Sequence, residues 1–203
     1  MAICKLCFKK IRDTSFIHLI RRDLCLCENC YNEMKPTFKR FYLLRHKGTA
    51  LYDYTSAIRS RLYQFKGCYD IEISTIFLDR YKYYFRLKYH GFLIIPAPSY
   101  SGDNDQRGFN HVIEMFKTVG LPIVEAFIKT EHHKQTESGF LGRQEIGNYI
   151  KLNGNPDLRN KKILLVDDVF TTGSTLKSLI TLLEPLHPKT IEILVMSKTT
   201  NHR

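Results

Sequence analysis

The stretch that decides the fold is Ile163-Leu-Leu-Val-Asp-Asp-Val-Phe-Thr-Thr-Gly-Ser-Thr175. It begins with four apolar residues, which are typical of a buried strand, and two acids, Asp167 and Asp168, follow them at once. A short turn rich in hydroxyl side chains contains one glycine, Gly173, and opens a helix predicted over 174–184. The sequence therefore predicts a strand, a polar loop and a helix in direct succession.

Further strands and helices are predicted on both sides of this stretch. The strands cover 92–95, 123–127, 162–166 and 190–198, and the other helices cover 52–65, 69–87 and 109–119. Strands that alternate with helices at this spacing form a parallel sheet with right-handed crossovers, so the fold class is α/β. Ligands of such sheets bind beyond the carboxyl ends of the strands, and we expect a site in the loops after Ile95, Phe127 and Val166.

The loop after Val166 has the groups of a phosphate site. Backbone N–H groups at the start of a helix bind phosphate together with Ser and Thr hydroxyls. Two acids at the end of the strand can accept hydrogen bonds from neighbouring hydroxyls of a sugar. Together these parts predict a ribose 5-phosphate site. The structural alternative is that the acids simply end a strand and that Ser174 caps the helix.

Five of the six cysteines lie within the first 30 residues. The pairs Cys4-x-x-Cys7 and Cys27-x-x-Cys30 are 19 residues apart, a spacing typical of a four-cysteine zinc site. We therefore predict a closed structural zinc site, with Cys25 as the alternative to Cys27 and disulfides as the competing account. The predicted domains are a zinc finger over 1–35, a basic linker over 36–50 and the α/β domain over 51–203.

The basic charge is concentrated at the start of the chain. The whole sequence holds 31 Lys and Arg against 20 Asp and Glu, a net charge of +11, and residues 1–47 hold eleven basic against four acidic residues, or +7. Such a basic head suggests a polyanionic partner, although a merely solvated surface is the alternative. Cations interleaved with aromatic residues are typical of surfaces that bind single-stranded DNA. The alternative is that these aromatic residues pack the finger against the α/β domain. They are Phe16, Tyr31, Phe38, Phe41 and Tyr42.

No stretch approaches the run of about 18 apolar residues that a membrane span needs. The first residues, Met-Ala-Ile-Cys-Lys-Leu-Cys, lack the apolar segment of a signal peptide. We therefore expect a cytoplasmic protein without a membrane span.

The segment Val166–Thr175 resembles the phosphoribosyl-pyrophosphate (PRPP) motif of type I phosphoribosyltransferases. With the cysteine pattern added, the chain resembles the ComF/GntX family over nearly its whole length. Shorter matches to that family are Pro96-Ala-Pro98, Arg107-Gly-Phe-Asn110, Lys134-Gln135 and Arg143. The resemblance implies a type I phosphoribosyltransferase fold with an N-terminal zinc finger.

The resemblance also implies roles for individual residues. Asp167 and Asp168 would bind the ribose hydroxyls, directly or around magnesium, and the segment 129–154 would be a flap over the ligand. Arg107 and Gly108 would face the pyrophosphate. The 5-phosphate would be held by Thr171, Thr172, Gly173, Ser174 and Thr175.

The family implies a DNA-uptake protein of natural transformation that binds single-stranded DNA and PRPP, with a DNA helicase or other competence proteins as further partners. One alternative is an active phosphoribosyltransferase with an unidentified acceptor. Another is a scaffold whose finger docks a protein while PRPP reports nucleotide supply. Asp103 and Asp105, and Ile146 in the flap, stand near positions that are often basic in relatives. Because pyrophosphate release depends on cations around the leaving group, we expect these departures to weaken transfer.

Overall fold

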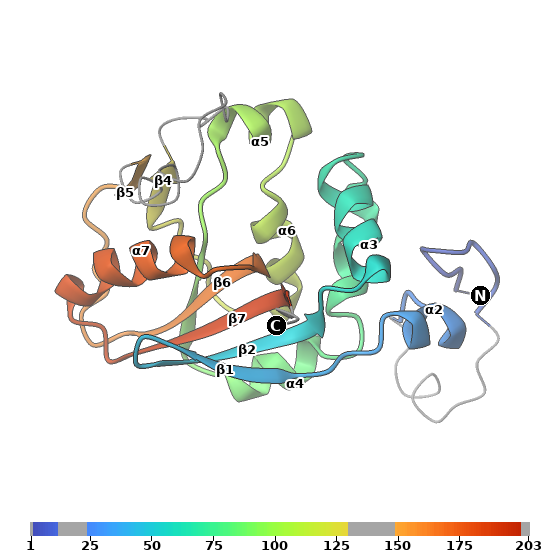
Figure 1. Cartoon of the computed structure of the whole chain (residues 1–203), viewed down its shortest axis with the longest axis horizontal. Helices are drawn as coiled ribbons and strands as arrows, with labels where there is room; N and C mark the ends of the chain where they lie inside the picture. The colour runs from blue at the N-terminus through green and yellow to red at the C-terminus, as the bar shows by residue number, and fades with distance from the viewer. Residues whose placement is uncertain (1, 12–23, 130–148, 200–203) are drawn as a thin grey trace.

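The computed structural model describes residues 2–11, 24–129 and 149–199 (Figure 1). Its centre is a five-stranded sheet in the order β1-β2-β7-β6-β3. The strands are β1 (Lys39–Leu43), β2 (His46–Asp53), β3 (Phe92–Pro96), β6 (Lys162–Phe170) and β7 (Thr190–Lys198). All neighbouring pairs are parallel except β1 with β2, which is antiparallel. The predicted α/β class with a mainly parallel sheet is therefore confirmed.

Helices cover both faces of the sheet, which explains why β6 begins with an unbroken apolar run. Ile163 and Leu165 pack with α7 (Ser174–Leu183) on one face, and Leu164 and Val166 pack into the core of the other face. That second core is covered by α3 (Ser56–Lys66), the 3₁₀ helix η1 (Ile71–Phe77), α4 (Lys82–Lys88) and α6 (His111–Phe116). The four strand residues are fully buried, as in a sheet that helices cover on both sides.

The helix predicted over 69–87 is wrong as one element, because η1 and α4 are separate. Its first half contains the β-branched residues Ile71, Ile73 and Ile76, which favour the regular α-helix less than unbranched residues do. Between the two helices, Asp79 accepts a hydrogen bond from the backbone N–H of Cys25 at 3.1 Å. This tertiary contact fixes the turn where a continuous helix was expected.

The predicted strand over 123–127 is also wrong. Only a single bridge joins Ile123 to Ile94 at the free edge of β3. The N–H of Ala126 turns back to the carbonyl of Val124 at 3.0 Å, which takes the chain away from the sheet. The following strand β4 (Phe127–Lys129) pairs instead with β5 (Ile150–Leu152) in a separate antiparallel sheet.

Residues 36–50 differ from the expected linker, because they contain β1 and most of β2. This hairpin forms one edge of the main sheet, so the polypeptide enters the domain before residue 51. Consequently the helix predicted from residue 52 begins later, at Ser56, where Thr55 caps it by accepting the N–H of Ile58. The finger boundary at residue 35 stays a prediction.

The remaining elements are short helices. They are α2 (Glu28–Glu33), α5 (Ser101–Arg107), η2 (Lys117–Val119) and η4 (Glu184–Leu186). The sequence did not predict α5, which contains Asp103 and Asp105. The flap residues Lys134, Gln135, Arg143 and Ile146 lie outside the described residues, as does Phe16. Among the described helices, none has the length and apolar character that a bilayer crossing requires.

Candidate functional site

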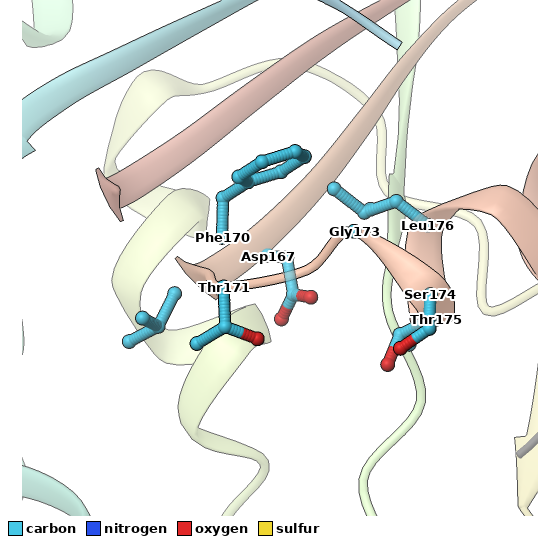
Figure 2. Close-up of a pocket in the computed structure, with 8 residues that line it drawn as sticks. Asp167, Phe170, Thr171, Gly173, Ser174, Thr175 and Leu176 are labelled. Atoms are coloured by element: carbon cyan, nitrogen blue, oxygen red, sulfur yellow. The ribbon is translucent and has the colours of Figure 1, made fainter. Parts of the chain in front are cut away.

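A pocket opens where β6 ends and α7 begins (Figure 2). It is open to solvent, and about 200 Å³ is the empty space in and directly above it, adjoining solvent included. Its walls come from the strand end, the connecting loop and the first turn of the helix: Asp167, Val169, Phe170, Thr171, Gly173, Ser174, Thr175 and Leu176. The pocket therefore lies at the carboxyl end of a central parallel strand, as predicted for a ligand site.

The polar groups of the pocket face a common space. In Figure 2 the oxygens of Asp167, Thr171, Ser174 and Thr175 lie on one side of the loop, while Phe170 and Leu176 lie on the other. Thr172 Oγ1 lies 3.0 Å from Ser174 Oγ, a hydrogen bond that links the loop to the helix. One carboxylate and several hydroxyls at the start of a helix suit a ligand that carries both hydroxyl and phosphate groups.

Gly173 gives the loop its shape. Its φ of 75° lies in the left-handed region, and an added Cβ would be 2.8 Å from the Phe170 ring and 3.1 Å from Leu43. Phe170 in turn packs on Phe41 of β1, with ring centroids 4.6 Å apart. Gly173 has no side chain with which to cap α7, and the N–H of Ser174, the first residue of the helix, donates to Thr172 Oγ1 at 3.4 Å.

The two acids after the apolar run have different surroundings. Asp167 lines the pocket, and its Oδ1 accepts the backbone N–H of Asp168 at 2.8 Å. The Asp168 side chain is buried instead beside Lys66, whose Nζ donates to its Oδ2 at 2.6 Å. His111 Nε2 lies 3.4 Å from the same oxygen, and the N–H of Val169 donates to Oδ1 at 2.7 Å. One acid is thus available to a ligand, whereas the other is engaged within the protein.

These surroundings move the two pKa values in opposite directions. Burial, together with the neighbouring charge of Asp168, raises the pKa of Asp167 well above its ordinary value. Burial would also raise the pKa of Asp168, but the hydrogen bond from His111 and the charge of Lys66 outweigh it and lower that pKa. Asp168 is therefore the carboxylate that stays ionised, and Asp167 takes up a proton more readily.

Arg107 extends the contacts around Asp168. Its Nε donates to the carbonyl of Lys66 at 3.0 Å, and its NH1 lies 3.2 Å from His111 Nδ1. A guanidinium has no acceptor, so Nδ1 accepts this hydrogen bond and the proton of a neutral His111 resides on Nε2, where it can be donated to Asp168. We call Lys66, Asp168, His111 and Arg107 the Asp168 network.

The structure thus divides the residues predicted for PRPP. The pocket brings together Asp167, Thr171, Gly173, Ser174 and Thr175, with Thr172 beside them. Asp168 and Arg107 lie in the neighbouring network, and Gly108, with a φ of 79°, ends α5. Sequence reasoning missed Lys66 and His111. Only tertiary folding brings Lys66 to Asp168, 102 residues away, although His111 could have been noticed next to Arg107-Gly-Phe-Asn110.

The predicted metal ligands Cys4, Cys7, Cys27 and Cys30 come together, with their sulfur atoms all within 4.8 Å of one another. Cys7 Sγ lies 3.7 Å from Cys27 Sγ. Tetrahedral zinc with Zn–S bonds of about 2.3 Å places its sulfurs roughly 3.8 Å apart, so this spacing fits the metal. We call these four residues the cysteine cluster.

Cys25 lies outside the cysteine cluster. Its Sγ is 3.6 Å from Thr75 Oγ1, and burial, with the charge of Asp79, raises the pKa of its thiol to about 12. In Cys4, by contrast, hydrogen bonds from the backbone of Cys27 and Cys7 outweigh burial and lower the pKa to about 7. The structure therefore chooses Cys27 over Cys25 as the fourth member, because the Cys27 sulfur lies within 4.8 Å of the other three and the Cys25 sulfur is not part of this group.

The aromatic residues of the basic head mostly pack within the protein. Tyr31 shares a hydrogen bond with the hydroxyl of Tyr81, and Arg80 lies 3.8 Å over its ring. The ring of Phe38 is 5.0 Å from that of Tyr81, and Phe41 packs on Phe170 as described. For these three residues the structure supports packing of the finger and hairpin on the body. Tyr42 differs, since 70% of it is exposed.

Comparison with known proteins agrees with this geometry. The phosphoribosyl transferase domain family matches residues 107–201, which include the whole pocket. Competence protein ComFC of Bacillus subtilis is 27% identical over 153 residues, which cover 74% of this chain and 62% of that protein, so less than two thirds of it is spanned. Competence protein ComFC of Streptococcus pneumoniae is 27% identical, with 93% of this chain and 96% of that protein covered.

Two further similarities are more limited. Competence protein F of Haemophilus influenzae is 30% identical over 108 residues, which cover 49% of this chain and 47% of that protein. A solved hypoxanthine phosphoribosyltransferase from Staphylococcus aureus superimposes with a TM-score of 0.43 at 18% identity, with 66% of this chain and 67% of that one covered.

The sheet and the matched domain define the class: the chain has a phosphoribosyltransferase-type fold. More narrowly, the chain is similar to the competence proteins ComFC and F, and the cysteine cluster near its N-terminus could hold a metal.

Proposed function

We propose that this chain is a cytoplasmic competence protein that binds single-stranded DNA during natural transformation. In the same proposal, the pocket after β6 holds PRPP or a related ribose 5-phosphate ligand. The names of the competence relatives support the first part, and the matched phosphoribosyl transferase domain supports the second.

The observation that carries the ligand assignment is the set of groups that converge on the pocket. The hydroxyls of Thr171, Ser174 and Thr175, with the first N–H groups of α7, would bind the 5-phosphate. Asp167 would accept hydrogen bonds from the ribose hydroxyls or help to hold magnesium. We propose that Asp168 acts differently, by fixing Lys66 and His111 beside the pocket rather than by contacting the ligand.

As the family resemblance implies, Arg107 and Gly108 would face the pyrophosphate of PRPP in this proposal. Lys66 and His111 would then be the other groups able to oppose its negative charge, since both belong to the Asp168 network with Arg107. When bound with PRPP, magnesium would neutralise part of the pyrophosphate charge. At the other end of the chain, we propose that zinc occupies the cysteine cluster as a structural ion, because four thiolates leave no open position for a catalytic water.

A second candidate function is phosphoribosyl transfer to an unidentified acceptor. The pocket favours it because four of the five residues predicted to hold the 5-phosphate, Thr171, Gly173, Ser174 and Thr175, line it. Release of pyrophosphate from PRPP in the presence of nucleobases or single-stranded DNA would establish it. PRPP binding without release would leave the chain as a binding protein. A DNA helicase or another competence protein remains a proposed partner of the finger.

Calorimetric titration with PRPP and magnesium tests the pocket. We expect Thr175→Val to weaken binding roughly 10-fold or more, because a hydrogen bond to a charged group contributes about 1.5–3 kcal/mol. Thr181→Val is the matched control, since Thr181 lies on the same helix but bonds back to the carbonyl of Lys177. Equal affinity of the two variants, or no PRPP binding by the unmodified protein, would contradict the assignment.

Titration of labelled single-stranded DNA tests the other half of the proposal. Binding should weaken as salt is raised, because phosphate contacts release counterions. If the protein binds PRPP but does not bind DNA at low salt, the proposed role in DNA handling is contradicted, whereas the assignment of PRPP to the pocket is not.

A further inference from the structure

Two segments of the chain combine cations and aromatic rings without any acid. The segments 34–52 and 80–92 contain no Asp or Glu. They hold nine Lys and Arg residues: Lys35, Lys39, Arg40, Arg45, Lys47, Arg80, Lys82, Arg86 and Lys88. The second segment contributes α4, which is also rich in tyrosine. Such a composition is uncommon for a surface that serves only solubility, because soluble surfaces usually mix the two signs of charge.

These segments are neighbours in space. Figure 1 shows α4 beside β1, on the side of the sheet away from α7. The ring of Phe38 lies 6.1 Å from that of Tyr84. Burial, with the nearby positive charge of Arg40, lowers the pKa of Lys88, although Glu192 of β7 acts in the opposite direction. Thus Arg40 of β1 and Lys88 of α4 are close enough to repel each other.

Strand alternation decides which side chains of β1 face α4. Phe41 packs on Phe170, in the core on the α7 side. Its neighbours Arg40 and Tyr42 therefore project to the opposite face, the one that α4 covers. Tyr42 is 70% exposed, and on α4 the exposed fractions are 54% for Tyr83, 50% for Tyr84 and 80% for Leu87.

We define the α4–β1 face as the exposed or charged side chains that these two elements contribute: Arg40, Tyr42, Tyr83, Tyr84, Leu87 and Lys88. Lys88 Nζ lies 6.0 Å from the centre of the Tyr84 ring, so cation and ring are presented together. Two nearby acids limit the positive charge: Glu192 faces Lys88, and Asp53 pairs with Lys39 at 2.7 Å. Arg40 has no ion pair among the described residues.

We infer that the α4–β1 face is where single-stranded DNA binds. This inference rests on the proposed function and moves the DNA site away from Tyr31 and Phe38, whose rings pack against Tyr81. Exposed rings stack on unpaired bases while adjacent cations contact phosphates, and this pairing of groups is what sequence-tolerant binding of single strands requires. A duplex would hide its base faces from these rings, so single strands are the better fit.

Fluorescence anisotropy with a labelled thymidine oligonucleotide tests the rings. Tyr84→Leu keeps an apolar side chain but removes the ring, and it should weaken binding roughly 5- to 100-fold. Tyr84→Phe should bind within about twofold of the unmodified protein, because the ring that stacks is retained. The control is Tyr63→Leu, which removes a ring that is 66% exposed on α3. Unchanged melting temperatures establish that each variant is folded.

The salt dependence tests the cations. Arg40→Gln with Lys88→Gln should reduce the slope of log affinity against log salt by about 1.4, since each lost phosphate contact removes roughly 0.7 for single strands. Lys161→Gln with Lys189→Gln makes the same change in charge at exposed positions outside the face and should leave the slope unchanged.

The outcomes separate this inference from the proposed function. If the unmodified protein does not bind single-stranded DNA, the proposed DNA role fails, and this inference fails with it. If it binds DNA but the face variants behave like their controls, the α4–β1 face is overturned and the DNA role stands. If polyglutamate competes as strongly as the oligonucleotide, the face is an acidic-protein surface and the DNA assignment is overturned. Loss of DNA binding confined to the face variants, with PRPP affinity unchanged, supports it.

Discussion

The cysteine cluster brings together ligand groups from two separate segments, whereas the loop after β6 presents groups from one continuous stretch, and the two are supported in different ways. The cluster joins two short turns near the N-terminus, and the helix beside it, α2, has six residues. The loop is held at both ends by the core, with the buried β6 on one side and Leu176, Leu179 and Ile180 of α7 on the other.

This difference indicates which of the two sites depends on a bound ligand for its shape. Four thiols packed within 4.8 Å repel as thiolates unless a cation lies between them, so we expect the cluster to need an ion to keep its shape. The loop after β6 already has its shape from packing, because Gly173, Phe170 and Phe41 fit against one another. We therefore expect changes in the cluster to affect folding most, and changes in the loop to affect binding most.

The largest effect is expected from Cys4→Ser. Loss of one ligand should release the metal and lower the melting temperature by roughly 10 °C, since a loss of about 3 kcal/mol shifts the midpoint 2–4 °C per kcal/mol in a chain of this size. Metal content measured by mass spectrometry, with thermal unfolding, checks this. Cys68→Ser is the control because Cys68 is exposed and outside the cluster. If Cys4→Ser retained the metal, the cluster would not depend on all four thiols, and the contrast with the loop after β6 would fail.

Gly173→Ala should have the next largest effect, and it should act on both stability and binding. The left-handed backbone and the contact with Phe170 would destabilise the fold by about 2 kcal/mol. The altered loop should also lose PRPP affinity, as calorimetry would measure. The control Gly154→Ala shares a positive φ but meets no atom within 4 Å, so it isolates the backbone cost. Equal effects of the two variants would show that packing against Phe170 does not shape the loop.

Lys66→Met tests whether the Asp168 network is held by charge. Removing one partner of a buried pair costs about 3–5 kcal/mol, but Lys66 is 39% exposed, so water should reduce this to about 1–2 kcal/mol. Because the folded chain lowers the pKa of Asp168, the stability it contributes is present above about pH 4 and is lost as pH falls below that value. Chemical unfolding at pH 7 and pH 3.5 measures this.

In Lys66→Met the stability lost between those two pH values should be smaller than in the unmodified protein, because the variant keeps the hydrogen bond from His111 but loses the Lys66 charge that also lowers the pKa of Asp168. Lys162→Met is a control on the same strand as Asp168 but at its exposed start. An unchanged pH dependence in Lys66→Met would show that other groups keep Asp168 ionised.

The smallest effect on stability, and one of opposite sign, is expected from Asp167→Asn. The folded chain raises the pKa of Asp167, so its ionised form disfavours the fold, and stability should rise as pH falls through that raised pKa. The amide should therefore stabilise the chain by about 1 kcal/mol at neutral pH while PRPP binding weakens. Thermal unfolding and calorimetry on the same samples check both. A less stable variant would mean that Asp167 supports the loop.

Much of this could be predicted before the structure was known. The run Ile163–Val166 predicts a buried strand, because a strand that helices cover on both faces is apolar at every position. The structure confirms this strand as the first half of β6. Cys4, Cys7, Cys27 and Cys30 follow a spacing that brings two turns to one ion, and their sulfurs converge. The hairpin over 39–53 was not predicted, because Lys39 and Arg40 make the edge strand β1 resemble a charged linker.

By itself the sequence determined the α/β class, the polar loop after Val166 and the presence of a four-cysteine cluster, because periodicity and short spacings are local properties of the chain, whereas the structure chose Cys27 over Cys25. Only the tertiary structure decided that Asp167 and Asp168 have different partners. Lys66 reaches Asp168 from 102 residues away, and no local pattern encodes such a contact. It also decided that the basic aromatic surface joins α4 to β1, since Arg40 and Lys88 become neighbours only when the helix packs on the sheet.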